Sequence, residues 1–156
     1  MIPAVAFLCI RVDVRPFLSR QNPVVAELLQ SCQGRELDAH YLAFFECFNH
    51  QLFFEAHEVL EELWLARRGT AKDLFYKGLI QLAGAFVHIQ KRRPQPAASL
   101  LELARGNLEP YAPVYDRLEV ESVLAQIDRW LETARNGDAW ERWLAREKPL
   151  VQLLAS

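Results

Sequence analysis

The stretch that decides the fold of this chain is Phe48 to Trp64, which reads FNHQLFFEAHEVLEELW. It mixes aromatic side chains with acidic and imidazole ones more densely than any other segment: His50, Glu55, His57, Glu58, Glu61 and Glu62. At about 100° per residue, His50, His57, Glu61 and Trp64 fall on one stripe of a helix, with Phe54 beside them. The stretch therefore predicts a helix over about residues 50–67 that carries a site.

This helix has a marked end and a close neighbour. Arg67 and Arg68 suit the negative end of the helix dipole, and Gly69 can adopt the left-handed conformation that ends a helix. Thr70, with Asp73 three residues on, predicts the cap of a second helix over about residues 71–91. Such a short connection makes the two helices an antiparallel hairpin. The second helix is apolar nearly all round, from Leu74 onward, which predicts that it lies buried at the centre of a bundle.

Capping residues and helical spacing predict further helices on both sides of the hairpin. Asn22-Pro23 begins one that Gly34 closes, and another runs from about residue 36 to a break near Asn49. Later helices are expected at about 96–105, with Leu103 on the core side and Gly106 at the end, at 120–136 and from Asp138 to Pro149, then a short turn at 150–154. No segment alternates with a period of two, so no strand is predicted. The fold class is all-α: a single-domain multi-helix bundle built around a central antiparallel hairpin of residues 50–91.

Composition and charge narrow the function. The chain has 156 residues and a formal net charge of −2, so bulk electrostatics favour neither nucleic-acid nor membrane binding. The three cysteines (Cys9, Cys32 and Cys47) are odd in number and scattered, as expected of reduced thiols in a cytoplasmic protein. The apolar run Ile2–Ile10 is too short to span a bilayer and lacks the basic start of a signal peptide. Residues 1–21 are thus expected to form an N-terminal arm, and residues 22–156 the helical domain.

Pairing of the two hairpin helices predicts a polar cluster. On the second helix, Lys77, Gln81 and His88 share one face, so the cluster would comprise His57, Glu58, Glu61, Lys77, Gln81 and His88. In one interpretation it is a buried hydrogen-bond network that is purely structural. In the other it binds a divalent metal: His57-Glu58-x-x-Glu61 is one residue away from the zincin motif, which makes His57, Glu61 and His88 ligands and Glu58 a base.

Other metal and nucleophile motifs fit less well. The ferritin-like di-iron pattern is absent because position 54 is Phe, and a magnesium site would find only Asp73 on the second helix. Cys47 is best interpreted as a small buried apolar residue.

The run FNHQLFFEAHEVLEELW, followed by FYKGLIQLAGAFVHIQK, closely resembles domain-of-unknown-function family 309, whose members are small all-helical proteins. The resemblance covers about residues 40–115, and Gly84 departs from the larger residue that the family often carries. It implies the fold and no reaction. Its signature positions are Asn49, Phe54, Glu55, His57, Glu58, Glu61, Trp64, Gly78, Gln81 and His88.

Two function classes stay open. The first is a non-catalytic structural or interaction module, a homo-oligomer or a binder of a protein partner. The second is a protein that binds a metal or a small ligand, including a metal-dependent hydrolase. The ligand-binding candidates are Asn49, Glu55, His57, Glu58, Glu61, Trp64, Lys77, Gln81 and His88, and the metal-ligand candidates among them are His57, Glu61 and His88.

Overall fold

Helices α3 (Phe53–Ala66) and α4 (Asp73–Gln90) form the predicted antiparallel hairpin of this all-α protein. The computed structural model describes residues 22–136 and 145–155. Four more α-helices pack around the hairpin in these residues: α1 (Pro23–Cys32), α2 (Ala39–Asn49), α5 (Pro94–Leu108) and α6 (Val120–Arg135). The predicted fold class is therefore confirmed.

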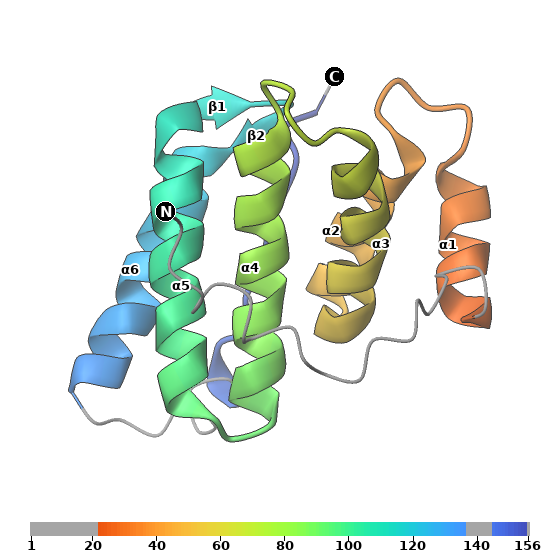
Figure 1. The fold of residues 1–156 in the computed structure, drawn as a ribbon. Helices are drawn as coiled ribbons and strands as arrows, with labels where there is room; N and C mark the ends of the chain where they lie inside the picture. The colour runs from red at the N-terminus through yellow and green to blue at the C-terminus, as the bar shows by residue number, and fades with distance from the viewer. Residues whose placement is uncertain (1–21, 137–144, 156) are drawn as a thin grey trace.

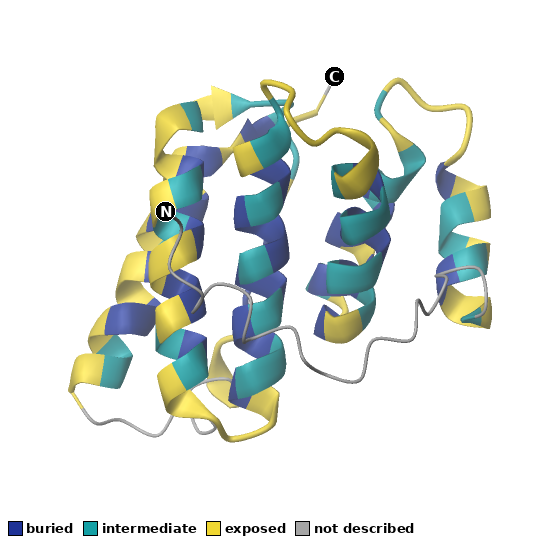
Figure 2. Cartoon of the chain, in the orientation of Figure 1, coloured by how far each residue is buried: buried dark blue, intermediate teal, exposed yellow. Residues whose placement is uncertain are grey.

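The helices lie in two layers (Figure 1). Helices α5, α4 and α3 stand side by side in one layer, with α6 behind α5 and α2 behind α3, and α1 flanks α2. The core fills the space between the layers (Figure 2). Phe48, Phe53 and Phe86 meet there in mutual ring contacts with centroids 5.1–5.5 Å apart, and Phe86 also meets Trp130. Each such buried ring contributes about 1.5–3 kcal/mol of transfer free energy.

The break between α2 and α3 falls later than the sequence predicts. Asn49 ends α2 and forms two hydrogen bonds with the backbone of Val151, at 2.8 and 2.9 Å. Gln51 then adopts φ 61°, and α3 begins at Phe53 instead of His50. His50 is thus the exposed C-cap of α2, and its expected place on the His57 stripe is wrong. The start of α2 also shifts, because Asp38 caps it by accepting from the His40 N–H at 2.8 Å.

Helix α4 is buried on most sides but not all round. Five positions at helical spacing stay partly or fully exposed and form what we call the α4 stripe: Leu74, Lys77, Gln81, Gly84 and His88. Leu74 is 46% exposed, so its expected place in the core is wrong. Leu103 on α5, also expected in the core, is 41% exposed. Gly78 of α4 lets α5 approach closely, since a Cβ there would lie 2.7 Å from Leu108 Cγ.

The prediction of no strands is wrong at one point. After α5, which continues through Gly106 to Leu108, and a 3₁₀ turn (Glu109–Tyr111), strands β1 (Val114–Tyr115) and β2 (Leu118–Glu119) pair antiparallel. Asp116 and Arg117 between them both have positive φ, which tight hairpin turns require. Leu118 also bridges to Leu153, so residues 150–154 are extended and the expected short turn is wrong.

The predicted N-terminal arm lies outside the described residues, as does most of the predicted last helix, at 137–144. Within the described ranges, no helix combines the length and the apolar character needed to cross a membrane.

Candidate functional site

His57 lies on the side of α3 that faces α4. A Cβ added at Gly84 would be 3.9 Å from His57 Cδ2, so the imidazole packs against the glycine of the α4 stripe. The side chain is 17% exposed, and burial lowers the pKa of His57 to about 4. The imidazole is therefore neutral at pH 7. Its Nδ1 lies 4.0 Å from Glu61 Oε2, which is too long for a hydrogen bond.

Glu58 and Glu61 lie beside this histidine on the outer side of α3. Burial, followed by the nearby charges of Glu55, Glu61 and Glu62, raises the pKa of Glu58 to about 7. Burial also raises the pKa of Glu61. Within the described part of the chain, the Glu58 carboxyl group makes no hydrogen bond and no ion pair. The surroundings thus disfavour charge on three neighbouring ionisable side chains.

The α4 stripe supplies the opposing polar groups. Gln81 Oε1 accepts from Asn107 Nδ2 of α5 at 2.7 Å. His88 Nδ1 is buried and, in the described residues, lacks a hydrogen-bond partner. Burial, and then Arg93 and Lys91, lower the pKa of His88. Lys77 lies on the same stripe, half-buried. His57 packs against Gly84, which lies between Gln81 and His88 on the α4 stripe. This is the side of α4 on which the predicted cluster is expected.

Apolar side chains frame these polar groups. Phe54 and Leu65 on α3 are 42% and 55% exposed, three residues before His57 and four after Glu61. Leu74 begins the α4 stripe. Leu103 on α5 follows Leu100, which contacts Gly84, by three residues and precedes Asn107 by four. Helical spacing therefore puts all four on one side of the α5–α4–α3 layer. We call this surface the α3–α4–α5 face: Phe54, His57, Glu58, Glu61, Leu65, Leu74, Lys77, Gln81, Gly84, His88 and Leu103.

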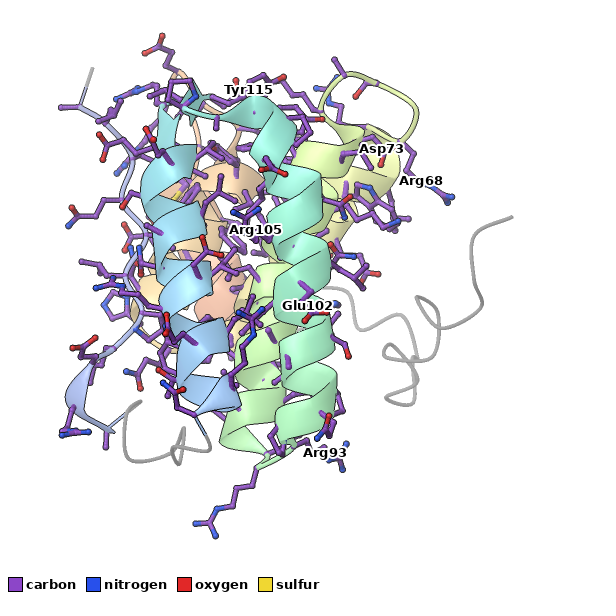
Figure 3. All side chains as sticks on the ribbon, turned by 90° about the vertical axis from the view of Figure 1, so that its left-hand side faces the viewer. Arg68, Asp73, Arg93, Glu102, Arg105 and Tyr115 are labelled. Carbon is purple, nitrogen blue, oxygen red and sulfur yellow. The ribbon has the colours of Figure 1, made fainter. Side chains whose placement is uncertain are left out.

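Three candidates from the sequence lie elsewhere: Asn49, Trp64 and Glu55. Asn49 is bound to Val151 at the α2–α3 break. Trp64 donates its Nε1–H to Asp73 at 2.7 Å, and the Arg68 guanidinium lies 5.2 Å from the Trp64 ring centroid. Figure 3 shows Arg68 and Asp73 close together at this end of the hairpin. These residues stabilise the fold.

Glu55 lies on the α2 side of the helix. After burial, its charge is the next cause that raises the pKa of the Cys47 thiol on α2 to about 12. Glu62 likewise meets His40 of α2, at 3.2 Å. Both glutamates therefore point away from the α4 stripe, as their spacing predicts.

The face does not present a complete set of metal ligands. Among residues 22–136 and 145–155, no group of three or more His, Cys, Asp or Glu side chains converges in a way that could hold a metal ion. His57 and Glu61 are the adjacent pair of donors, and His88 lies on the neighbouring helix. What the face offers chemically is an apolar surface around Glu58, which lacks a partner in the described residues, and Glu61, which lies 4.0 Å from His57 Nδ1.

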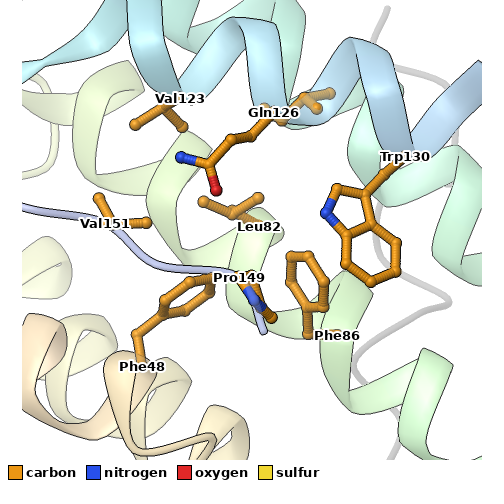
Figure 4. A pocket seen from close by; sticks show the side chains of 9 residues that line it. Phe48, Leu82, Phe86, Val123, Gln126, Trp130, Pro149 and Val151 are labelled. Atoms are coloured by element: carbon orange, nitrogen blue, oxygen red, sulfur yellow. The ribbon is translucent and has the colours of Figure 1, made fainter. Parts of the chain in front are cut away.

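A separate hollow lies on the other side of α4 (Figure 4). Aromatic and aliphatic side chains line it, with Trp130 of α6 and Phe86 of α4 at one end and Val151 at the other. Its polar side chain, Gln126, donates to the Leu150 carbonyl at 2.9 Å. The hollow thus belongs to the packing of the C-terminal segment.

Sequence reasoning missed the apolar frame of the face. The sequence predicts core positions for Leu74 and Leu103 because each lies in an apolar run. The spacing Leu74–Lys77–Gln81 is a signal that could have placed Leu74 on the polar side of α4.

Comparisons with known proteins bear on the hairpin and the helices beside it. Residues 41–109 match the family described as Domain of unknown function (DUF309). The resemblance seen in the sequence is confirmed over these residues, which run from α2 through α5. No curated protein and no solved structure matches the chain. The match is to a family of unknown function, so the function has to be argued from the geometry of the face.

Proposed function

We propose that this protein is a non-catalytic interaction module whose α3–α4–α5 face binds an amphipathic polypeptide segment with apolar and basic side chains. The observation that carries the proposal is that four large exposed apolar residues surround Glu58, a carboxylate without a partner in the described residues: Phe54, Leu65, Leu74 and Leu103. Large exposed apolar side chains that gather on one face of a small protein mark a binding surface.

The polar groups of the face select the chemistry of the partner. Glu58 and Glu61 are partly buried carboxylates, which are costly unless a cation or a donor pairs with them. His57 and His88 have lowered pKa values, so they add little positive charge at pH 7. Lysine or arginine on the incoming segment would pair with the glutamates, while its apolar side chains cover the leucines and Phe54.

The experiment is a binding titration with designed peptides. Fluorescent amphipathic peptides of one length carry leucine on one face and either lysine or glutamate on the other, and anisotropy reports binding to the full chain. We expect the lysine peptide to bind more tightly, and Leu74→Asp and Leu103→Asp each to weaken it about tenfold, or ~1.4 kcal/mol.

Matched controls come from exposed apolar residues away from the face. Val24 on α1 is 50% exposed and Leu150 is 48% exposed, so Val24→Asp and Leu150→Asp should leave the affinity unchanged. Equal binding of the two peptides, or equal loss in all four variants, would overturn the proposal.

A second candidate function, a metal- or small-ligand-binding protein, is favoured by the neutral His57 imidazole beside Glu61. A neutral imidazole and a carboxylate are good ligands for divalent zinc or manganese. The described residues supply two donors in contact instead of three, which makes this candidate second. Metal analysis of the purified protein separates the two functions, because the interaction module requires no bound metal.

We also propose a cytoplasmic location. Cys32 and Cys47 are free thiols in the structure, both buried, and their lack of a disulfide fits a reducing compartment.

A further inference from the structure

The α3–α4–α5 face is open to a segment of the same chain as well as to a partner. The helices of the described chain pack on the other sides of α3, α4 and α5, and the four apolar residues of the face stay 41–55% exposed. Residues 1–21 precede α1 and contain the uncharged, largely apolar run Ile2–Ile10.

We propose that the chain's own N-terminal segment, residues 2–15, docks on the α3–α4–α5 face and is the segment that a partner must displace. This inference rests on the proposed function and names the first occupant of the same surface. The segment has the chemistry that the face selects. Its apolar run supplies side chains such as Val5 and Leu8, and the next residues include Arg11 and Arg15, with Asp13 as the acid between them.

The length of the connection permits this docking. Residues 11–21 join the apolar run to Asn22, the cap of α1, and eleven extended residues span up to about 36 Å. Helix α4 has 18 residues and is about 27 Å long. Helices α1, α2 and α3 are successive antiparallel neighbours, so the first turn of α1 lies at the same end of the molecule as the first turn of α3 (Figure 1). A tether of this length gives an effective concentration on the order of millimolar.

Charge favours the N-terminal segment over a second copy of the face. The α3–α4–α5 face carries Glu58 and Glu61, so a symmetric pair of faces would bring these carboxylates together. Residues 1–21 carry three arginines and one aspartate, and they bring the opposite charge. An arginine beside Glu58 would also give that carboxylate the partner it lacks in the described residues.

The experiment measures paramagnetic broadening in the full chain. A spin label is attached at position 13 of a Cys9→Ser/Asp13→Cys variant, and the other thiols, Cys32 and Cys47, are 3% and 0% exposed and stay unlabelled. We expect the backbone amides of Glu61, Gln81 and Gly84 to broaden selectively, and those of α6 to stay sharp. Adding Val5→Asp and Leu8→Asp should abolish the broadening while the spectrum of the folded domain persists.

Two further samples decide between one chain and two. Tenfold dilution should leave the broadening unchanged. A mixture of isotope-labelled chain without the spin label and unlabelled chain with it should show none. Uniform or absent broadening overturns the proposal, and broadening in the mixture overturns it in favour of the segment of a second copy.

The peptide titration separates this inference from the proposed function. If the N-terminal segment occupies the face, the Val5→Asp/Leu8→Asp chain should bind the lysine peptide at least severalfold more tightly than wild type does. Equal affinities would overturn the docking of residues 2–15 and leave the binding face intact, whereas loss of peptide binding in both chains would overturn the proposed function.

Discussion

The polar groups at the first turn of α4 have hydrogen-bond or ion-pair partners, whereas some of those along and beside the α4 stripe have none in the described residues. At the first turn, Asp73 accepts from Trp64 Nε1 at 2.7 Å and from the Gly69 N–H at 2.8 Å. One residue earlier, Lys72 Nζ lies 2.6 Å from Asp116 Oδ2, and the Tyr41 hydroxyl donates to the Asp116 carbonyl at 3.0 Å. On the stripe, His88 Nδ1 has no hydrogen-bond partner in the described residues, and neither does Glu58 on the neighbouring α3.

This difference separates polar groups that folding pairs from polar groups that it leaves without partners in the described residues. Native proteins pair almost all their buried polar atoms, and the α3–α4 connection follows that rule. The α3–α4–α5 face departs from it, with acids of raised pKa beside a histidine of lowered pKa. Groups that folding leaves without partners weaken the fold, which is expected where binding supplies the partners.

The largest expected effect is the pH dependence that His57 creates. Its pKa is about 4 in the fold against 6.5 for an ordinary histidine, so between these values the unfolded chain binds a proton that the folded chain does not. The contribution of His57 to the free energy of unfolding is therefore complete above pH 6.5. It falls by on the order of 3 kcal/mol as the pH drops to 4. The raised pKa values of Glu58 and Glu61 act in the opposite direction, so wild type alone shows a flattened profile.

Urea denaturation of wild type and His57→Leu from pH 4 to 8 isolates the contribution of His57 to the free energy of unfolding. The difference in free energy between the two proteins should be constant above pH 6.5 and shrink below it. His57→Gln, which does not titrate either, should give a difference of the same shape. A difference that stays constant down to pH 4 would show that the imidazole is not desolvated. Asp73, whose pKa is lowered chiefly by the Gly69 N–H, loses its contribution only as the pH falls below about 3.8, outside the His57 window.

The second largest effect is expected at the first turn of α4, where Asp73 accepts two hydrogen bonds. Asp73→Ala removes the acceptor of two hydrogen bonds and leaves Trp64 Nε1 and the Gly69 N–H without it, so we expect a loss of about 2 kcal/mol in urea denaturation. Asp73→Asn keeps one acceptor oxygen and should lose about half as much. The matched control is Asp128→Ala, because Asp128 is 51% exposed and pairs with Arg105 at the surface, where such pairs contribute under about 1 kcal/mol. Equal losses for Asp73→Ala and Asp128→Ala would remove the contrast between the two regions.

Sequence patterns predicted the hairpin well because its signals are local. Gly69 has φ 77° at the α3–α4 connection, as expected. The expected Thr70 cap is wrong, because α4 begins at Asp73 with Lys72 as its N-cap and no side chain caps it, although Thr70 Oγ1 accepts from the Lys72 N–H at 3.3 Å. Asn22 caps α1 as expected. Helical spacing and antiparallel pairing also put His57 on the side of α3 that faces α4, where it packs against Gly84.

The errors have long-range causes. Asn49 is 102 residues from Val151, and no local pattern shows that the extended C-terminal segment pairs with it. The same segment provides Leu153 for the bridge to Leu118. Helical spacing puts Trp64 on the same side of α3 as His57. Its indole N–H needs an acceptor, however, and donates to Asp73 at 2.7 Å. The exposure of Leu74 and Leu103 depends on which faces of three packed helices stay open, which a single helix pattern does not contain.

The smallest effect has the opposite sign and is the sharpest test of the unpaired region. Glu58→Met keeps a straight chain of similar volume and good helix propensity while it removes a carboxylate whose ionisation burial disfavours. Since the pKa of Glu58 is about 7 in the fold and 4.5 in an unfolded chain, its destabilising effect is fully present at pH 8 and nearly gone at pH 5. We expect Glu58→Met to gain up to about 1 kcal/mol at pH 8, after allowance for solvent screening, and little at pH 5. Glu102→Met on the exposed side of α5 (Figure 3) is the control and should change stability by less than about 0.5 kcal/mol at either pH. A loss of stability at pH 8 in Glu58→Met would mean that Glu58 is held by a partner in the free protein. The two polar regions of α4 would then be of one kind.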